Sequence, residues 1–459
     1  MKLRLFFIMV LGLALPGSIL SQTLTVSENQ RYLCKNGEPF LWIGDTAWDL
    51  FRQLDRGETD QYLQDRAEKG FTVIQAVVLF GRGGVDKPNA YGNRPFIDND
   101  LRKPNPEYFQ HVDHAMQRSR ELGLVMGLLP TWGNYWGAGD PENRLLNPEN
   151  ACEYGKFLGE RYIDEPLVWI LGGDENIKNE YERETIRELA RGLQEGDGGA
   201  HLITFHPRGP GLSSEFAHDE DWLDFNMVQS SHGGHGHDNG LYAEHDYGLT
   251  PVKPTLDGEP RYENIPVGFY FQGMNAQDKF DAFDCRQAAY WSLLAGACGH
   301  TYGHNSVFQF YQGGTPGAFD AQIPWQQALD HPGAFQMGLV RKLFESRPYY
   351  LLQPAQYVIL NGPTSGPEKI RAALAGDRSF VMIYSPYGVP FTLDSRIVEA
   401  AETREIWFDP RHGFSYDIHT THTMGFQTYT PPTRGRGNDW ILIIEDKDKN
   451  FPFPVIQQW

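Results

Sequence analysis

Residues 167–176 read Leu-Val-Trp-Ile-Leu-Gly-Gly-Asp-Glu-Asn, and this stretch decides the fold. An unbroken apolar run of this length predicts a strand buried on both faces, as in a parallel sheet covered by helices. Glycines and acidic residues follow it, so the predicted strand, 167–174, ends in polar groups. Apolar runs of the same kind predict further strands at 40–48, 72–80, 124–132, 201–207, 224–231, 253–259 and 299–307.

Helical patterns lie between these strands. They cover residues 58–69, 106–122, 149–162, 180–193 and 281–297. The first two are followed directly by Gly70 and Gly123, and glycine is the residue type that most often ends a helix. Strands alternating with helices predict a parallel sheet, and eight strands are the number that closes a TIM barrel. A doubly wound open sheet is the alternative, but no Gly-x-Gly-x-x-Gly motif follows the first strand.

The pattern changes from about Pro348. Short apolar runs, separated by turn sequences such as Asn361-Gly362-Pro363, replace the helical stretches. They predict strands at 357–360, 370–374, 380–384, 391–393, 405–408, 426–430 and 440–444. The sequence therefore predicts an α/β protein: a (β/α)8 TIM barrel over residues 22–347, followed by a small all-β sandwich domain over residues 348–459. With no low-complexity linker between them, we expect the two domains to pack together.

Residues 1–21 have the pattern of a secretory signal peptide. Lys2 and Arg4 precede an apolar run, 5–15, that is too short to span a bilayer. The alternative is a buried N-terminal helix. Because no other apolar run reaches the ~20 residues of a membrane helix, we expect a secreted or periplasmic protein without membrane insertion.

Composition narrows the class of partner. The 459 residues contain 40 Lys and Arg against 59 Asp and Glu, a formal net charge of −19, which argues against nucleic acid as the partner. The 61 aromatic residues (11 Trp, 22 Tyr and 28 Phe) suggest clefts suited to sugars. The four cysteines form no Cys-x-x-Cys pair, so a structural zinc site is not predicted.

Two predicted strands end in carboxylates: Asp174 on the fourth and Glu259 on the seventh. In a TIM barrel the active site forms where the strands end, and these two strands lie on roughly opposite sides of the ring. Facing carboxylates are what glycosidic bond cleavage requires, one as the acid and the other as nucleophile or base. The alternative for each is that it caps the following helix. Glu175 adjoins Asp174, so in an extended chain only one of the two faces the pocket.

Other strand ends supply candidates for holding a sugar. Tryptophans stack on sugar rings, histidines and Tyr262 can bond to hydroxyls, and Asp45 either clamps a hydroxyl or caps the next helix. For His206 and His304 the alternative is a structural histidine whose hydrogen bonds are made within the protein. The predicted substrate-binding residues are Asp45, Trp48, Trp132, Trp136, Glu175, His206, His232, Tyr262 and His304.

A metal site is the main competing interpretation. His232, His235, His237 and Asp238 have spacings that suit zinc, and would make the barrel a metal-dependent hydrolase. However, they lie in a glycine-rich loop, and no carboxylate–histidine set occurs at the first strand. The sequence thus predicts no metal and no cofactor.

Five stretches resemble the apiosidase-like enzymes of glycoside hydrolase family 140. They are residues 42–48 (WIGDTAW), 169–176 (WILGGDEN), 253–263 (KPTLDGEPRYE), 302–307 (YGHNSV) and 406–413 (IWFDPRHG). The resemblance implies a retaining glycosidase in which Asp174 is the acid/base and Glu259 the nucleophile. It also implies a poly- or oligosaccharide substrate, with characterised relatives releasing apiose-linked side chains from the pectin rhamnogalacturonan II. A non-catalytic glycan-binding barrel is the further alternative, and the sequence makes no prediction of oligomeric state.

Overall fold

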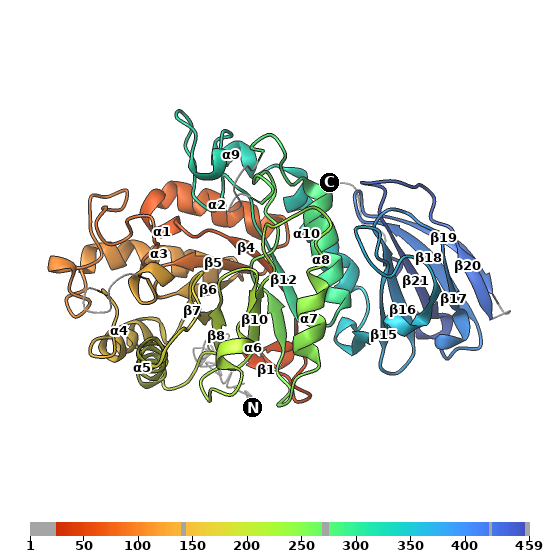
Figure 1. The fold of residues 1–459 in the computed structure, drawn as a ribbon, viewed down its shortest axis with the longest axis horizontal. Coiled ribbons are helices and arrows are strands. Elements are labelled where there is room, and N and C mark those ends of the chain that lie inside the picture. Colours follow the sequence, from red (N-terminus) through yellow and green to blue (C-terminus); the bar gives the residue numbers. More distant parts are fainter. Residues whose placement is uncertain (1–23, 139–143, 269–274, 422–424, 455–459) are drawn as a thin grey trace, which may run out of the picture.

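Eight parallel strands curl around an apolar interior in the computed structural model, which describes residues 24–138, 144–268, 275–421 and 425–454 (Figure 1). In chain order they are β4 (Trp42–Thr46), β5 (Val73–Val77), β6 (Val125–Leu129), β7 (Leu167–Gly172), β8 (Ile203–His206), β10 (Asn226–Gln229), β11 (Thr255–Asp257) and β12 (Gly299–Tyr302). The order in the sheet is β8-β7-β6-β5-β4-β12-β11-β10, and the short β9 (Gly211–Leu212) pairs antiparallel with β10.

The two ends of this sheet meet. The Asp224 amide donates to the Ile203 carbonyl (2.9 Å), and the Thr204 hydroxyl donates to the Phe225 carbonyl (2.7 Å), so β8 adjoins the start of β10. Side chains of Trp42, Ile170 and other strand residues fill the interior, as the apolar runs require. The predicted barrel is confirmed.

Helices cover the outside of the ring. The longer ones are α2 (Arg56–Glu68), α3 (Pro106–Glu121), α4 (Ala151–Tyr162), α5 (Glu180–Asp197), α7 (Gly240–Tyr247), α8 (Ala282–Leu294) and α10 (Pro332–Glu345). The short ones are α1 (Leu50–Gln53), α6 (Ser214–Ala217) and α9 (Trp325–Ala328). Asp55 and Asp281 begin α2 and α8 with capping boxes, which explains why these helices start where they do.

A small antiparallel sheet precedes the barrel. It consists of β1 (Leu24–Val26), β2 (Leu33–Lys35) and β3 (Glu38–Phe40), and its residues Leu24, Leu33 and Phe40 join the apolar interior of the barrel. The run predicted as one strand over 40–48 is therefore divided between β3 and β4. The predicted signal peptide lies outside the described residues.

The C-terminal domain is a β-sandwich. One antiparallel sheet contains, in spatial order, β13 (Leu352–Pro354), β15 (Arg371–Ala375), β16 (Phe380–Ser385), β21 (Trp440–Asp446), β18 (Thr403–Asp409) and β19 (Phe414–Thr421). The other contains β14 (Ile359–Asn361), β17 (Phe391–Asp394) and β20 (Phe426–Tyr429). Apolar side chains such as Ile383, Leu393 and Leu442 fill the space between the sheets. The strand predicted at 357–360 starts instead as a 3-10 turn, and β13 and β19 were not predicted.

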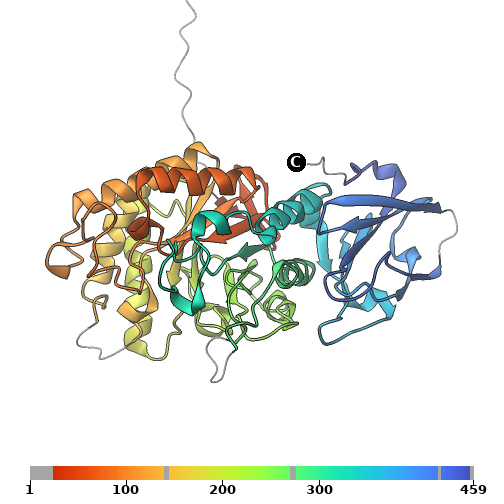
Figure 2. The ribbon, with the colours of Figure 1, turned by 90° about the horizontal axis from the view of Figure 1, so that it is seen from above.

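The six-stranded sheet packs its other face on the barrel (Figures 1 and 2). Tyr290 on α8 and Met337 on α10 share one apolar cluster with Met382 of the sandwich. A buried ion pair, Arg286–Asp439 at 2.7 Å, also joins the two domains. None of the helices in the described part of the chain has the length and apolar character needed to cross a bilayer.

Candidate active site

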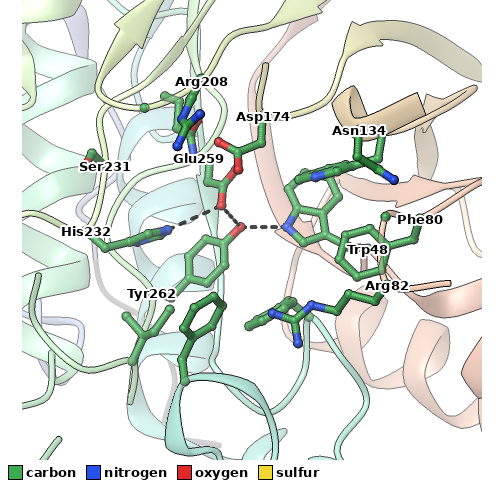
Figure 3. A pocket seen from close by; sticks show the side chains of 17 residues that line it. Trp48, Phe80, Arg82, Asn134, Asp174, Arg208, Ser231, His232, Glu259 and Tyr262 are labelled. Atoms are coloured by element: carbon green, nitrogen blue, oxygen red, sulfur yellow. Dashed lines mark hydrogen bonds and ion pairs between the residues drawn. The ribbon is translucent and has the colours of Figure 1, made fainter. Parts of the chain in front are cut away.

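A pocket of about 510 Å³ opens where the parallel strands end (Figure 3). Six of the residues predicted from the sequence line it: Trp48, Trp132, Asp174, His232, Glu259 and Tyr262. The pocket thus brings together side chains from five different strand ends, as expected for a TIM barrel. The other lining residues are Phe80, Gly81, Arg82, Asn134, Arg208, Gly209, Gln229, Ser231, Ile265, Phe308 and Phe319.

A left-handed turn presents Asp174 to the pocket. Gly172, Gly173 and Asp174 have φ angles of 86°, 91° and 59°. A Cβ atom at Gly172 would lie 2.4 Å from the His206 carbonyl oxygen, and one at Gly173 would lie 3.0 Å from the Thr131 carbonyl oxygen. Only glycine satisfies both the conformation and the contact, so the two glycines are the reason that β7 can turn here.

Asp174 has a strongly altered acidity. Burial raises the pKa of its carboxyl group from 3.8 to about 7, and the nearby negative charge of Glu259 adds to this rise. His206, Arg208 and Gln229 act in the opposite direction but are outweighed. Asp174 is therefore largely protonated below neutral pH, which is the state that a general acid needs.

Glu259 has the opposite character. Its Oε2 atom lies 2.9 Å from His206 Nε2, and its Oε1 atom lies 3.4 Å from His232 Nε2. Oε1 also accepts a hydrogen bond from the Tyr262 hydroxyl (2.8 Å), which in turn accepts from the Trp48 indole N–H (3.0 Å). Burial alone would raise the pKa of Glu259, but the contacts with His206 and His232 lower it from 4.5 to about 2. Glu259 is thus an anion at all ordinary pH values.

The imidazole ring of His206 contacts both Asp174 and Glu259. The Asp174 amide N–H donates to His206 Nδ1 (3.1 Å). Because an amide N–H can only donate, Nδ1 carries no proton, and the ring proton lies on Nε2, facing Glu259. His206 is fully buried and packs against both Trp48 and Trp132, with ring centroids 5.6 and 5.8 Å away. It therefore positions both residues without lining the cavity itself.

The wall of the pocket that faces Glu259 contains residues that were not predicted from the sequence as binding residues. The Arg82 guanidinium lies over the rings of Phe308 and Phe319, at 5.6 and 5.2 Å from their centroids. Phe80 packs edge-on against Trp132, with 5.1 Å between centroids. The one sequence signal for this wall is the run Phe80-Gly-Arg-Gly-Gly, which places an arginine among glycines directly after a strand.

Besides His206, four predicted binding residues do not line the pocket, and the structure corrects these five expectations. Asp45 is fully buried, where Arg66 Nε (2.7 Å) and the Tyr62 hydroxyl (2.8 Å) contact its carboxylate. His304, also buried, lies against His331, with 3.0 Å between their ring nitrogens. Side chains engaged in such buried contacts are not available to a ligand.

The other two corrections concern the Asp174 turn. Trp136 is buried behind it and donates its indole N–H to the Gly172 carbonyl (2.8 Å), so it supports the turn from outside. Glu175 points away from the pocket and forms an ion pair with Lys178 (2.8 Å). Of the adjacent acids, only Asp174 faces the cavity.

The residues of the proposed metal site contact different partners. His232 faces Glu259, His235 lies between Asp278 (2.9 Å) and Asp284 (3.0 Å), and His237 contacts the Tyr242 hydroxyl. Within the described ranges, no group of three or more His, Cys, Asp or Glu side chains is arranged to hold a metal ion. The geometry gives this alternative no support.

Comparison with known families identifies the chain. A family model described as "Apiosidase-like, catalytic domain" matches residues 27–351. The chain belongs to the apiosidase-like family. A second model, described as "Putative collagen-binding domain of a collagenase", matches residues 353–445 of this apiosidase-like chain. A search of curated proteins found no significant match to this chain.

Solved structures agree with this assignment. One named "Glycoside hydrolase" is 32% identical, covers 94% of this chain and 98% of its own, and superposes with a TM-score of 0.85. A glycoside hydrolase family 5 protein from Bacteroides vulgatus ATCC 8482 is 31% identical, covers 95% and 96% of the two chains, and has a TM-score of 0.86. The apiosidase-like chain is therefore a glycosidase by family, and the resemblance seen in its sequence is confirmed.

Proposed function

We propose that this chain is a secreted, retaining glycoside hydrolase that cleaves apiose linkages in pectic glycans such as rhamnogalacturonan II. The observation that carries the proposal is the pair of carboxyl groups with opposite acidity in one pocket. Asp174 holds its proton up to a pH of about 7, whereas Glu259 is ionised down to a pH of about 2. This difference supports Asp174 as the acid and Glu259 as the nucleophile.

The reaction would proceed in two displacements. In the first, Asp174 gives its proton to the leaving oxygen while the Glu259 carboxylate attacks the anomeric carbon and forms a glycosyl ester. In the second, Asp174, now ionised, takes a proton from water, which attacks the same carbon and releases Glu259. Figure 3 shows the two carboxyl groups pointing toward each other, which supports direct attack by Glu259 rather than activation of a distant water.

Two features of the wall support a pectic substrate. Trp48, Phe80 and Trp132 offer aromatic surface for sugar faces. Arg82 and Arg208 bring positive charge into a protein whose net charge is −19, so they offset the repulsion that an acidic glycan would meet. The other arginine near this region, Arg261, is buried against Trp291 and does not line the pocket.

Product analysis tests the proposal. The purified enzyme is incubated with pectic side chains and, in parallel, with aryl apiosides and aryl arabinosides. We expect release of apiose-terminated products, with NMR of the first product showing the anomeric configuration of the substrate. Inversion of configuration would overturn the retaining mechanism, and hydrolysis of arabinosides alone would overturn the apiose assignment.

Two variants test the roles of the carboxylates. Glu259→Ala is expected to lose activity and to regain it with azide, giving a glycosyl azide of inverted configuration, because azide replaces the missing nucleophile. Asp174→Ala is expected to keep activity only on aryl glycosides with good leaving groups, which need no proton. A Glu259→Ala variant with full activity would remove Glu259 from the mechanism.

Export is tested separately. The N-terminal sequence of protein recovered from the periplasm or medium is expected to start near residue 22. Retention of Met1 on the exported protein would contradict cleavage of the leader.

A further inference from the structure

A glycine-rich loop links the candidate nucleophile to the C-terminal domain. Residues 230–239 connect β10 to α7 and include Gly233, Gly234 and Gly236. At the start of this loop, His232 Nε2 lies 3.4 Å from Glu259 Oε1, and its ring lies 4.5 Å from that of Tyr262. Since glycines leave the backbone many conformations, the loop sequence alone does not fix the position of His232.

Contacts with the sandwich domain fix the far end of the loop. The Asp238 carboxylate accepts hydrogen bonds from Lys369 Nζ (2.6 Å) and from Arg371 Nη2 (2.7 and 3.0 Å). Arg371 is the first residue of β15 in the sandwich, Lys369 lies two residues before it, and both side chains are buried. We call these three residues the Asp238 clamp.

The chain around the clamp is closely packed. A Cβ atom at Gly236 would lie 2.6 Å from Pro367 Cβ, and one at Gly240 would lie 2.6 Å from the Arg371 guanidinium carbon. The loop therefore lies directly on the sandwich domain, with no room for a side chain between them. Segment 367–369 is itself held on the barrel, because Gln287 and Trp291 of α8 donate to the carbonyls of Pro367 (2.8 Å) and Lys369 (3.0 Å).

We propose that the sandwich domain positions His232 through the Asp238 clamp, and so completes the set of donors around Glu259. Asp238, Lys369 and Arg371 are positioning residues in this scheme and do not touch substrate. The inference assigns the C-terminal domain a part in the active site, and it rests on the proposed role of Glu259.

Hydrogen exchange tests the clamp without any substrate. In Asp238→Asn the side chain keeps its shape but loses the charge that two cations bind. Amides of peptides covering residues 231–240 are expected to exchange at least about tenfold faster than in the wild type, while the other barrel peptides stay unchanged. If Asp238→Asn does not fold, Lys369→Met removes one cation and is expected to give the same local effect.

Asp439→Asn is the matched control. It removes the charge from the buried Arg286–Asp439 pair, which joins the same two domains but does not touch the loop. We expect it to lower the Tm and to leave exchange in residues 231–240 unchanged. Equal acceleration in both variants, or none in Asp238→Asn, would overturn the proposal.

The pH profile then connects the clamp to catalysis. With His232 less well held, the acid limb of kcat/KM is expected to move to higher pH in Asp238→Asn and to stay in place in Asp439→Asn. An unmoved acid limb in Asp238→Asn, with the loop exchanging faster, would refute the link to Glu259. A wild-type protein without glycosidase activity would refute the proposed function and leave the exchange result intact.

Discussion

His206 offers a pair of substitutions that separates its two contacts. In His206→Asn, the amide reaches only the position of Nδ1, so it can still accept from the Asp174 N–H but no longer donates to Glu259. In His206→Gln, the amide nitrogen reaches the position of Nε2, so the donor to Glu259 remains and the acceptor for Asp174 is lost. The side chain is fully buried, which restricts both replacements to the space of the ring.

The structure sets the size of the effect. A hydrogen bond to a charged group contributes about 1.5–3 kcal/mol, and 1.36 kcal/mol corresponds to about one pKa unit. Loss of the 2.9 Å contact with His206 is therefore expected to raise the pKa of Glu259 from about 2 to about 3–4. At pH 3 the ionised fraction then falls about two- to tenfold relative to its value at pH 6, and the rate falls with it.

The assay is kcat/KM on an aryl glycoside between pH 3 and pH 9. In His206→Asn the acid limb is expected to move up by about one to two pH units. In His206→Gln it is expected to stay in place, with the loss falling mainly on substrates whose poor leaving groups need the proton of Asp174. An acid limb that stays in place in His206→Asn, or that moves equally in both variants, would refute this reasoning.

Three further variants test the structure. Asp174→Asn is expected to have a higher Tm than the wild type, by a difference that grows between pH 4 and pH 8. The folded wild type keeps the Asp174 proton up to a pH of about 7, whereas the unfolded chain loses it near pH 3.8, so the stability of the wild type falls over this range. Scanning calorimetry of both proteins at several pH values measures this difference. Gly173→Ala is expected to lose about 1–2 kcal/mol of unfolding free energy, because its φ of 91° disfavours a side chain, and to lose most activity. The control is Gly198→Ala, whose backbone is also left-handed (φ 67°) but has open space around it, and which is expected to lose stability alone. Urea unfolding measures the stability of both variants, and rate assays measure their activity. Asp45→Asn is expected to cost about 3 kcal/mol in urea unfolding, because it removes the fully buried carboxylate that faces Arg66 and leaves this buried cation only the partly exposed Asp65 (3.1 Å). An altered acid limb in the folded variant would contradict the placement of Asp45 outside the pocket.

Most of the fold follows from local pattern. Runs that are buried on both faces predict parallel strands, and each barrel strand of the structure falls within a predicted run. The missed strand β19 has a different character. Its sequence, Phe-Ser-Tyr-Asp-Ile-His-Thr-Thr, alternates apolar and polar residues at the edge of a sheet, and Tyr416 and Ile418 are exposed there. Such a strand depends on pairing with β18, a contact that the local sequence does not encode.

The candidate site was predictable where it lies at strand ends. Because all parallel strands end at the same side of the barrel, Asp174, Glu259 and Trp132 could be placed together from the sequence. The direction in which each side chain points could not, since it depends on the turn that follows the strand. Asp45 still belongs to β4 and faces the surrounding helices, whereas Asp174 lies beyond β7 on a turn that redirects it. Arg82 and Phe319 come from long loops, whose paths are set by tertiary packing.

The acidity of the pair depends on neighbours rather than on the net charge of the protein. A charge of −19 favours protonation of every carboxyl group, yet Glu259 and Asp174, in the same pocket, differ by about five pKa units. Distant surface charges are screened by salt within about 10 Å, whereas donors at 2.8–3.4 Å in a buried site are not. Glu259 has the contacts with His206, His232 and Tyr262, whereas for Asp174 burial and the charge of Glu259 outweigh the opposite effects of His206, Arg208 and Gln229. The proposed roles of acid and nucleophile therefore follow from which carboxyl group the donors reach. His206 contacts the backbone N–H of Asp174 and the carboxylate of Glu259, and so contributes to the difference between the two pKa values.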